Sequence, residues 1–275
     1  MYLAKAAINL AIREIANDQT PNYDGLKDNW ADNEDVFKKI TCNGEPDEFA
    51  AIGYDIEKGG QIETVFGLVD EERKININTA PKDLLIELLS KIGAANPIDI
   101  ANNICAWRVD DDVSAPDYGD LGYVNKGAKF RNIAELIMVK DIDEATYIKL
   151  KDLITVWGNG KININTASVK ILEILVEYCK KKTGKEPQDL TERIQALREA
   201  GIFFVSPDDL KTKLGTPSPL SQDQAKIIEE ASNMAVFKSS CFCSIANGTI
   251  KNHIFFSLQC IYNRDQNKIV YWHES

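Results

Sequence analysis

One seven-residue segment, KININTA, occurs twice without a mismatch, at residues 74–80 and 161–167. Each copy leads into a run whose apolar residues recur at helical spacing, PKDLLIELLSKIG after the first and SVKILEILVEYC after the second. Within each copy the two isoleucines alternate with polar residues, which is typical of a short extended segment with one buried face. The repeat therefore predicts two related units, each with a buried extended arm that enters a helix.

The end of each copy carries the signals of a helix start. Thr79 and Thr166 have hydroxyl groups that can accept hydrogen bonds from the free backbone donors of a first helical turn. Pro81 is tolerated in that turn, because its missing N–H would have no partner within the helix. We expect the threonines to cap the two helices, so that the repeat serves first as a packing device.

The hydrophobic period changes twice along the chain. Two alternating segments, DEFAAIGYDI and IETVFGLVDE, flank the glycines of EKGGQ and predict a β-hairpin. The C-terminal segments VFKSSCFCSIA, TIKNHIFFSLQCIYN and KIVYWHE also indicate strands, with the first turn at Asn247-Gly248. Between them the period is helical, and the predicted helices are 80–91, 97–108, 132–139, 143–154, 167–182, 188–200, 206–213 and 220–233.

Strands before and after a helical stretch predict an α+β fold in which an all-α insertion interrupts an antiparallel sheet. Residues 1–73 hold an N-terminal helix and the first strands, and residues 74–235 form the insertion with both KININTA units. Residues 236–275 complete the sheet. The predicted helix has an apolar stripe of Leu3, Ala7, Leu10 and Ala11 and no preceding cap. It is either the continuation of a helix whose earlier part is missing or an ordinary N-terminal amphipathic helix.

The charge of the chain limits its partners. The 275 residues carry a formal net charge of −10, which opposes nucleic-acid binding unless a local basic patch offsets it. The 44% hydrophobic content is that of a globular protein. The chain has no run of about 18 apolar residues, so none of its segments is predicted to span a membrane.

A DNA-binding function is the alternative that the repeat raises. The pattern INxNTA…LxxLLxxIG…AxxIxxWR resembles the helix-hairpin-helix modules of competence-type DNA-binding proteins, which hold phosphates through backbone N–H groups of a glycine hairpin. The stretch KIGAANPIDIANNICAWR lacks the paired glycines and inserts Ala-Ala-Asn-Pro after Gly93. The second copy has no hairpin glycine at the matching place. With the acidic net charge, these departures favour packing over DNA binding.

A cluster of aspartates follows Trp107-Arg108. The segment VDDDVSAPDYGDLGY holds five carboxylates on a loop with glycine and proline, and hard oxygen ligands on a flexible loop are what Ca²⁺ prefers. The spacing is not that of an EF-hand. A calcium site and a solvated acidic loop both remain open. The candidate ligands are Asp110, Asp111, Asp112, Asp117 and Asp120.

The remaining reactive residues indicate no enzyme. No phosphate loop, GxSxG elbow or HExxH motif is present, and His253 and His273 are expected on strand surfaces. A hairpin at Asn247-Gly248 would place Cys241 near residue 254 and Cys243 near residue 252, so the sequence selects no disulfide. The six cysteines are Cys42, Cys105, Cys179, Cys241, Cys243 and Cys260.

The order of motifs along the whole chain resembles the minor pseudopilin K family of the type II secretion system. The match comprises AAINLAIREIANDQTPNYDGLKDNWA, then DEERKININTA, then ICAWRVDDD with a downstream aromatic residue. It continues through KFRNIAELIMVKDIDEATYIKLKDLITVWGNGKININTAS to the closing IVYWHE. These segments cover nearly the whole chain in the order of the family.

The resemblance implies a fold, a location and partners. It implies a pilin-like sheet interrupted by a helix-hairpin-helix or SAM-like helical domain that binds calcium, although this chain has APDYGD where members often carry a Glu-Asp pair before a tyrosine. It implies an inner-membrane protein anchored by an N-terminal helix absent from this chain, with the soluble part in the periplasm.

By the same resemblance, the protein starts or caps the pseudopilus tip with the I- and J-type minor pseudopilins and supports protein export. We expect Leu3, Ala7, Leu10 and Ala11 to face neighbouring subunits, and we expect neither nucleic-acid binding nor catalysis.

Overall fold

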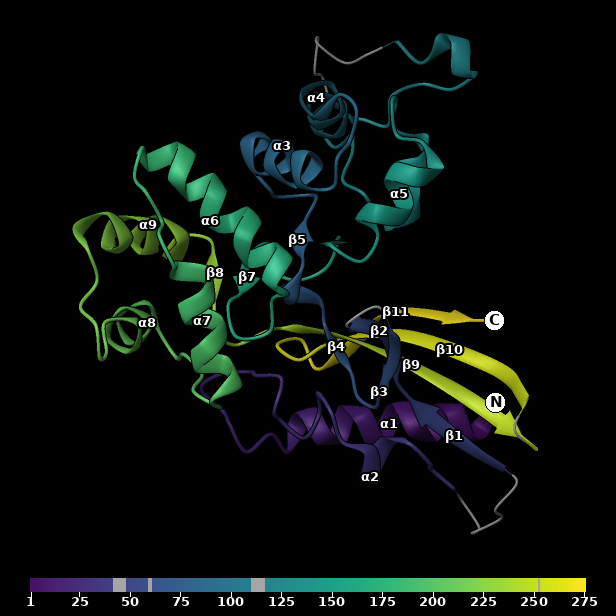
Figure 1. Cartoon of the computed structure of the whole chain (residues 1–275). Coiled ribbons are helices and arrows are strands. Elements are labelled where there is room, and N and C mark those ends of the chain that lie inside the picture. The colour runs from purple at the N-terminus through teal and green to yellow at the C-terminus, as the bar shows by residue number, and fades with distance from the viewer. Residues whose placement is uncertain (42–47, 59–60, 110–116, 252) are drawn as a thin grey trace. The chain divides into compact units, whose positions relative to one another are not determined.

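A computed structural model of the chain describes residues 1–41, 48–58, 61–109, 117–251 and 253–275 (Figure 1). The chain divides into two compact units. The sheet unit comprises residues 1–71 and 237–275, and the helical unit comprises residues 72–236. The helical unit is therefore an insertion in the sequence of the sheet unit.

The sheet unit is built on one antiparallel sheet with the strand order β1-β9-β10-β11. A short strand, β4, pairs with β9 on the same side as β1. β9 is therefore the central strand, and it joins N-terminal strands to C-terminal ones. The strands are β1 (Glu48–Ile52), β4 (Val69–Asp70), β9 (Cys241–Ile250), β10 (His253–Asn263) and β11 (Lys268–Glu274).

Helix α1 (Tyr2–Ala16) packs against this sheet (Figure 1). Its buried face is made largely of alanines, which allow the helix backbone to lie close to the strands. Ile8 and Ile15 lie on the same face and join Phe242 and Leu258 of the sheet in one core. Phe37 of the short helix α2 (Glu34–Phe37) is fully buried in the same core. The predicted α+β class, with an N-terminal helix and an antiparallel sheet, is confirmed.

The predicted N-terminal hairpin forms, but its first segment divides at Gly53. β2 (Tyr54–Lys58) pairs with β3 (Gln61–Val65) in a separate two-stranded sheet. The part before Gly53 becomes β1 and pairs with β9 instead. Gly53 lies where the chain passes between the two sheets, and a Cβ there would lie 2.8 Å from the carbonyl oxygen of Val65.

The C-terminal hairpin turns later than the sequence indicates. Asn247 and Gly248 lie within β9, not at a turn, and Cys243 pairs with Ile261 while Cys241 pairs with Asn263. The predicted register, with residue 241 near 254, is therefore wrong. The reason is that β1 pairs with β9 as far as Ile250, so hydrogen bonding to a distant strand overrides the local turn preference.

The helical unit contains the same order of elements twice. Each half begins with a two-residue strand, continues through helical elements and ends in another two-residue strand. The first half has β5 (Ile75–Asn76), α3 (Lys82–Lys91), α4 (Pro97–Trp107), α5 (Glu144–Leu150) and β6 (Ile154–Thr155), with 3₁₀ segments at Gly119–Leu121 and Ile133–Met138. The second half has β7 (Ile162–Asn163), α6 (Val169–Thr183), α7 (Leu190–Glu199), α8 (Pro207–Leu214), α9 (Gln222–Ser232) and β8 (Ala235–Val236).

In each half the first and last strands pair in parallel, so the end of the half closes against its KININTA segment. Ile75 is opposite Ile154 in the first pair, and Ile162 is opposite Ala235 in the second. The predicted burial of the isoleucines is confirmed, because all four are at most 2% exposed: Ile75, Ile77, Ile162 and Ile164.

The predicted threonine caps are wrong. Helix α6 begins after Ser168, whose hydroxyl accepts a hydrogen bond from the Ile171 N–H at 3.3 Å. Helix α3 begins after Pro81, which has no side-chain acceptor. In both copies the helix starts at least two residues beyond the threonine, because the chain first makes a hydrogen-bonded turn in which the N–H of the alanine bonds the carbonyl of the first asparagine at 2.9 Å.

Two further helix predictions need correction. The predicted helix 143–154 ends at Leu150, because Ile154 and Thr155 pair with β5 as strand β6. The predicted helix 132–139 is a 3₁₀ segment that starts with a capping box of Asn132 and Glu135. In the part of the chain that is described, no helix has both the length and the apolar character needed to cross a membrane.

Candidate functional site

The asparagines of the repeat hold each half together. In the first copy, Asn78 donates through Nδ2 to the Phe130 carbonyl at 2.9 Å and accepts from the Phe130 N–H at 2.8 Å. In the second copy, Asn165 makes the same pair of bonds to Phe204, both at 2.8 Å. Each asparagine side chain thus makes the two backbone hydrogen bonds that a neighbouring strand would otherwise make to Phe130 or Phe204. The motif has a structural role in both copies.

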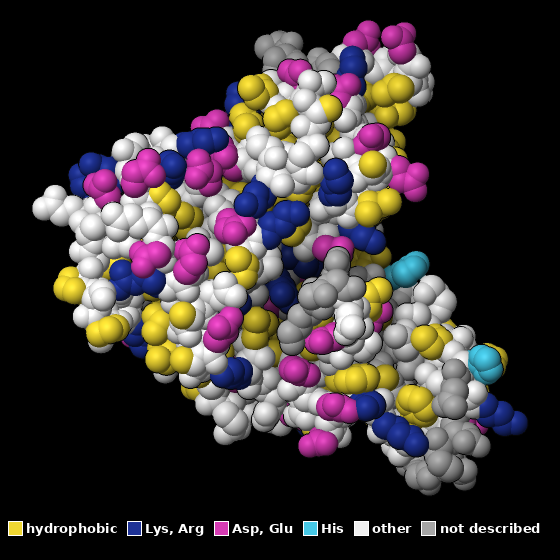
Figure 2. Space-filling model, viewed as in Figure 1, with side chains coloured by type: hydrophobic (Ala, Val, Ile, Leu, Met, Phe, Trp, Pro, Cys, Tyr) yellow, Lys and Arg dark blue, Asp and Glu magenta, His cyan; other side chains and the backbone are white. Residues whose placement is uncertain are grey.

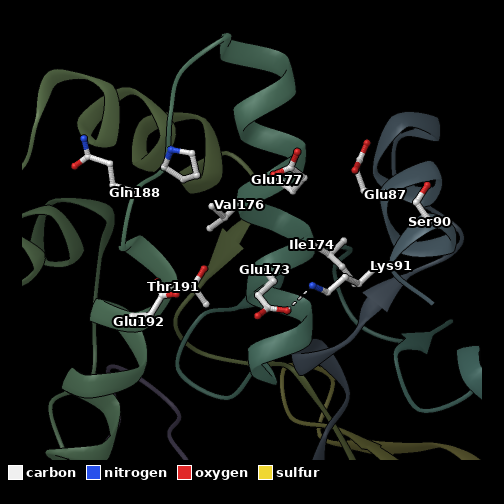
Figure 3. A pocket seen from close by; sticks show the side chains of 11 residues that line it. Glu87, Ser90, Lys91, Glu173, Ile174, Val176, Glu177, Gln188, Thr191 and Glu192 are labelled. Carbon is white, nitrogen blue, oxygen red and sulfur yellow. Dashed lines mark ion pairs between the residues drawn. The ribbon is translucent and has the colours of Figure 1, made fainter. Parts of the chain in front are cut away.

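A groove lies between α3, α6 and α7 of the helical unit, with a volume of about 480 Å³ (Figure 3). Four glutamates line it, and Lys91 pairs with Glu173 at 2.8 Å. Near the same groove Lys181 pairs with Glu87 at 2.6 Å. The four glutamates are Glu87, Glu173, Glu177 and Glu192.

Acidic side chains make this groove a poor place for phosphate, because both lining carboxylates and phosphates are anions. The lining of this groove is thus better suited to cations or basic side chains than to anions. The face seen in Figure 2 carries side chains of both signs.

Unlike a phosphate-binding hairpin, the turn after α3 has backbone N–H groups that are already hydrogen-bonded within the chain. The N–H groups of Ile92, Gly93 and Ala94 already donate to carbonyls of α3 at 3.0–3.1 Å. Backbone donors that are already bonded within the chain are not available to a phosphate.

The second half carries a glycine after its first helix, but not at the place that matches Gly93, in agreement with the prediction. Gly184 ends α6 at φ +66°, as Gly93 follows α3 at φ +71°. Because α6 has 15 residues and α3 has 10, the glycine comes later in the second copy.

The predicted calcium loop lies largely beyond the described residues. Asp110, Asp111 and Asp112 fall outside them. Asp117 and Asp120 are exposed, and Asp117 Oδ1 accepts the Gly119 N–H at 2.8 Å. The far end of the loop is anchored by Tyr118, which is buried edge-on against Trp107 with ring centroids 5.4 Å apart. Calcium binding by this loop stays a prediction.

The residues of the predicted partner-binding stripe of α1 differ in how deeply they are buried. Ala7 and Ala11 are fully buried under the sheet of the same unit, so they belong to the chain's own core and are not open to a partner. Leu3 and Leu10 are half-buried at the margin of that core, and their contact with a partner stays a prediction. The outward face of the helix presents Tyr2, which is 82% exposed.

The five described cysteines form no disulfide with one another, and four of them are buried. Cys241 and Cys243 lie on β9 and Cys260 on β10. Burial raises the pKa of the Cys260 thiol to about 12, and that of Cys179 to about 12 as well. These thiols are therefore unreactive parts of the core. His253 and His273 are exposed strand residues, as expected.

Comparison with known proteins identifies the fold. No protein-family model and no curated protein sequence matches the chain. Among solved structures, it is similar to a chain in the crystal structure of the GspK-GspI-GspJ complex from the type 2 secretion system of enterotoxigenic Escherichia coli. The TM-score is 0.73 at 16% sequence identity, with 100% of this chain and 95% of that chain covered. The chain therefore has a GspK-like fold throughout its length.

Proposed function

We propose that the protein is a minor pseudopilin of the type II secretion system, placed at the tip of the pseudopilus together with I- and J-type minor pseudopilins. The observation that carries this proposal is the likeness over the whole chain to a member of the GspK-GspI-GspJ complex. The likeness covers both the sheet unit and the insertion, so it is more specific than a shared sheet or a shared helical module alone.

In this proposal the sheet unit is the part that assembles. Helix α1 has one face packed on the sheet and an opposite face with Tyr2, Asn9 and Arg13 exposed. A helix of this kind can pack its free face on neighbouring subunits while the sheet keeps its position fixed. The anchor would be a membrane helix ahead of α1, with the part described here in the periplasm.

The helical unit would then act as a cap. It adds residues 72–236 between β4 and β9, and such a bulky insertion would prevent another subunit from stacking above it. This role is structural and requires no catalytic residue. It makes the protein a terminal subunit and not a repeating one.

The first test is co-purification with the I- and J-type minor pseudopilins encoded alongside this chain. We expect a stable complex with the unaltered protein and its loss with Tyr2→Asp combined with Asn9→Asp, which places two charges on the free face of α1. The matched control is Ile62→Asp on β3, which changes a residue of similar exposure, 76% against 82% for Tyr2, outside α1 and should leave the complex intact. No complex with the unaltered protein would refute the proposal.

The capping role has a separate test. A variant with residues 72–236 replaced by a short glycine-serine linker should still bind the partner pseudopilins, since α1 and the sheet remain. We expect it to fail at limiting pseudopilus length, measured by electron microscopy of pili from cells that overproduce the major subunit. Pseudopili of normal number and length would show that the insertion is not the cap.

A further inference from the structure

Three aspartates of the sheet unit converge in the loop that follows α1. One carboxylate oxygen from each of Asp18, Asp24 and Asp28 lies within 4.8 Å of the other two. Asp24 is fully buried and Asp28 is 7% exposed. Three acidic groups so close together and so far from solvent need partners, because burying a carboxylate without them is costly.

Two of the three have their partners within the chain. Asp24 accepts two hydrogen bonds from Arg264, Oδ1 from Nη1 at 2.9 Å and Oδ2 from Nη2 at 2.7 Å. Asp28 Oδ2 accepts from the Gly25 N–H at 2.8 Å and from the Trp30 indole N–H at 3.2 Å. These bonds fix the positions of both carboxylates.

Asp18 is different, because only one of its oxygens is satisfied. Its Oδ1 accepts from the N–H and the hydroxyl of Thr20, at 2.9 and 2.8 Å. Its Oδ2 is buried and has no hydrogen-bond partner. The side chain is 8% exposed, and the nearest atom of Arg264 is Nη1 at 3.7 Å, beyond hydrogen-bond distance. Asp18 Oδ2 is therefore a buried acceptor without a hydrogen bond, and it shares its ion pair to Arg264 with Asp24, to which the same Nη1 donates.

A cavity of about 120 Å³ adjoins the carboxylates of Asp18 and Asp28. Its lining is polar, and its volume is enough for an ion with a few water molecules. The residues around it are Glu14, Asn17, Asp18, Gln19, Thr20, Lys27, Asp28, Asn29 and Trp30.

We propose that Asp18, Asp24 and Asp28 bind a calcium ion, with Asp18 Oδ2 as a direct ligand. The donors are all oxygens, and Ca²⁺ accepts carboxylates and water together in an irregular arrangement, whereas Mg²⁺ requires a nearly ideal octahedron. Water in the adjoining cavity completes the coordination. This site lies in the sheet unit and is separate from the aspartate loop at residues 110–120.

The test is a calorimetric titration of the chelator-treated full chain with CaCl₂, paired with thermal melts in CaCl₂ and in chelator. The key variant is Asp18→Asn, which keeps the acceptor for Thr20 but replaces the free carboxylate oxygen by an amide. We expect it to lose one bound calcium per chain, or to bind there at least about tenfold more weakly. In chelator it should melt no lower than the unaltered protein, because a repulsive charge is gone.

Asp28→Asn provides a second variant if the first does not fold, with the same expected loss. The control is Asp117→Asn with Asp120→Asn, which alters the other acidic loop and should leave this site unchanged. Three outcomes would overturn the proposal. The first is that the unaltered chain binds no calcium at millimolar concentration. The second is full calcium binding by Asp18→Asn (by Asp28→Asn where Asp18→Asn does not fold), and the third is loss of this site in the control.

Discussion

The two halves of the helical unit have the same hydrogen-bonded backbone elements but differ in the side chains of their cores. Residues 74–155 and residues 161–236 both begin with a KININ segment whose isoleucines are buried. In both, an asparagine side chain bonds a phenylalanine backbone as a clamp, and a parallel strand pair closes the half. The first half then fills its interior with rings around Trp107. The second half uses four helices and a largely aliphatic interior instead.

The difference shows what the seven repeated residues specify. They set the extended arm, the clamp and the closing strand, all of which depend on backbone hydrogen bonds. They do not set the helix lengths or the core side chains, since α3 and α6 differ by five residues, ten against fifteen. The two halves are identical in the segment that makes these hydrogen bonds, and they differ in helix lengths and core side chains.

The strongest way to test this comparison is to remove the clamp in each half. Asn165 is fully buried and Asn78 is half-buried, so Asn165→Ala leaves the Phe204 N–H and carbonyl without partners or water. We expect a loss in the free energy of unfolding of about 3 kcal/mol for Asn165→Ala and about 1–2 kcal/mol for Asn78→Ala. Urea denaturation measures both, with Asn102→Ala on the exposed face of α4 as the control. Equal losses would show that the two clamps are equivalent.

The next test concerns an arginine in each half whose guanidinium donates to backbone carbonyls just before the first helix. Arg108 donates to the carbonyls of Ile77 and Ala80, whereas Arg198 donates to that of Ala167 at 2.7 Å. Burial lowers the pKa of Arg198 to about 10, and the charge of Arg73 adds to this. We expect Arg108→Met to cost about 2 kcal/mol and Arg198→Met about 1 kcal/mol or less, because a poorly solvated charge is removed in the second case.

The same denaturation series measures the arginine pair. A larger loss for Arg198→Met than for Arg108→Met would contradict the assignment of Arg198 as the weaker contributor.

The smallest effect is expected at the two helix starts. Ser168 caps α6, so Ser168→Ala should cost about 1 kcal/mol through loss of the bond to the Ile171 N–H. Pro81 makes no side-chain cap, so Pro81→Ala should change stability by less than about 0.5 kcal/mol. Thermal melts at one protein concentration compare the two. A loss at Pro81 as large as at Ser168 would mean that the first half depends on its start in another way.

Local patterns predicted the elements that rest on local physics. The apolar spacing of Leu84, Leu85, Leu88 and Leu89 predicted α3, and all four side chains are buried. The alternation of the isoleucines predicted the buried arms. What could not be predicted depends on distant partners: Asn78 bonds a residue 52 positions away and Asn165 one 39 positions away. Ile154 belongs to a helical pattern but pairs with β5.

The cluster of acidic side chains shows the same limit. Asp18, Asp24 and Asp28 are separated along a segment rich in Asn, Asp and Pro, a composition that predicts irregular structure but no particular contacts. Their convergence depends on Arg264 and Ser239, which come more than two hundred residues later. The five aspartates within residues 110–120 are recognisable from the sequence because they are close along the chain, whereas a cluster formed by folding is not.

The central position of β9 has a consequence for the order in which the protein can fold during synthesis. Strands β1 and β4 leave the ribosome early, but β9, with which both pair, follows only after residue 240. The helical unit pairs and packs within residues 72–236, so it can be complete before then. Helix α1 and strands β1 and β4 must therefore wait for the last part of the chain before the sheet that they pack in can be completed.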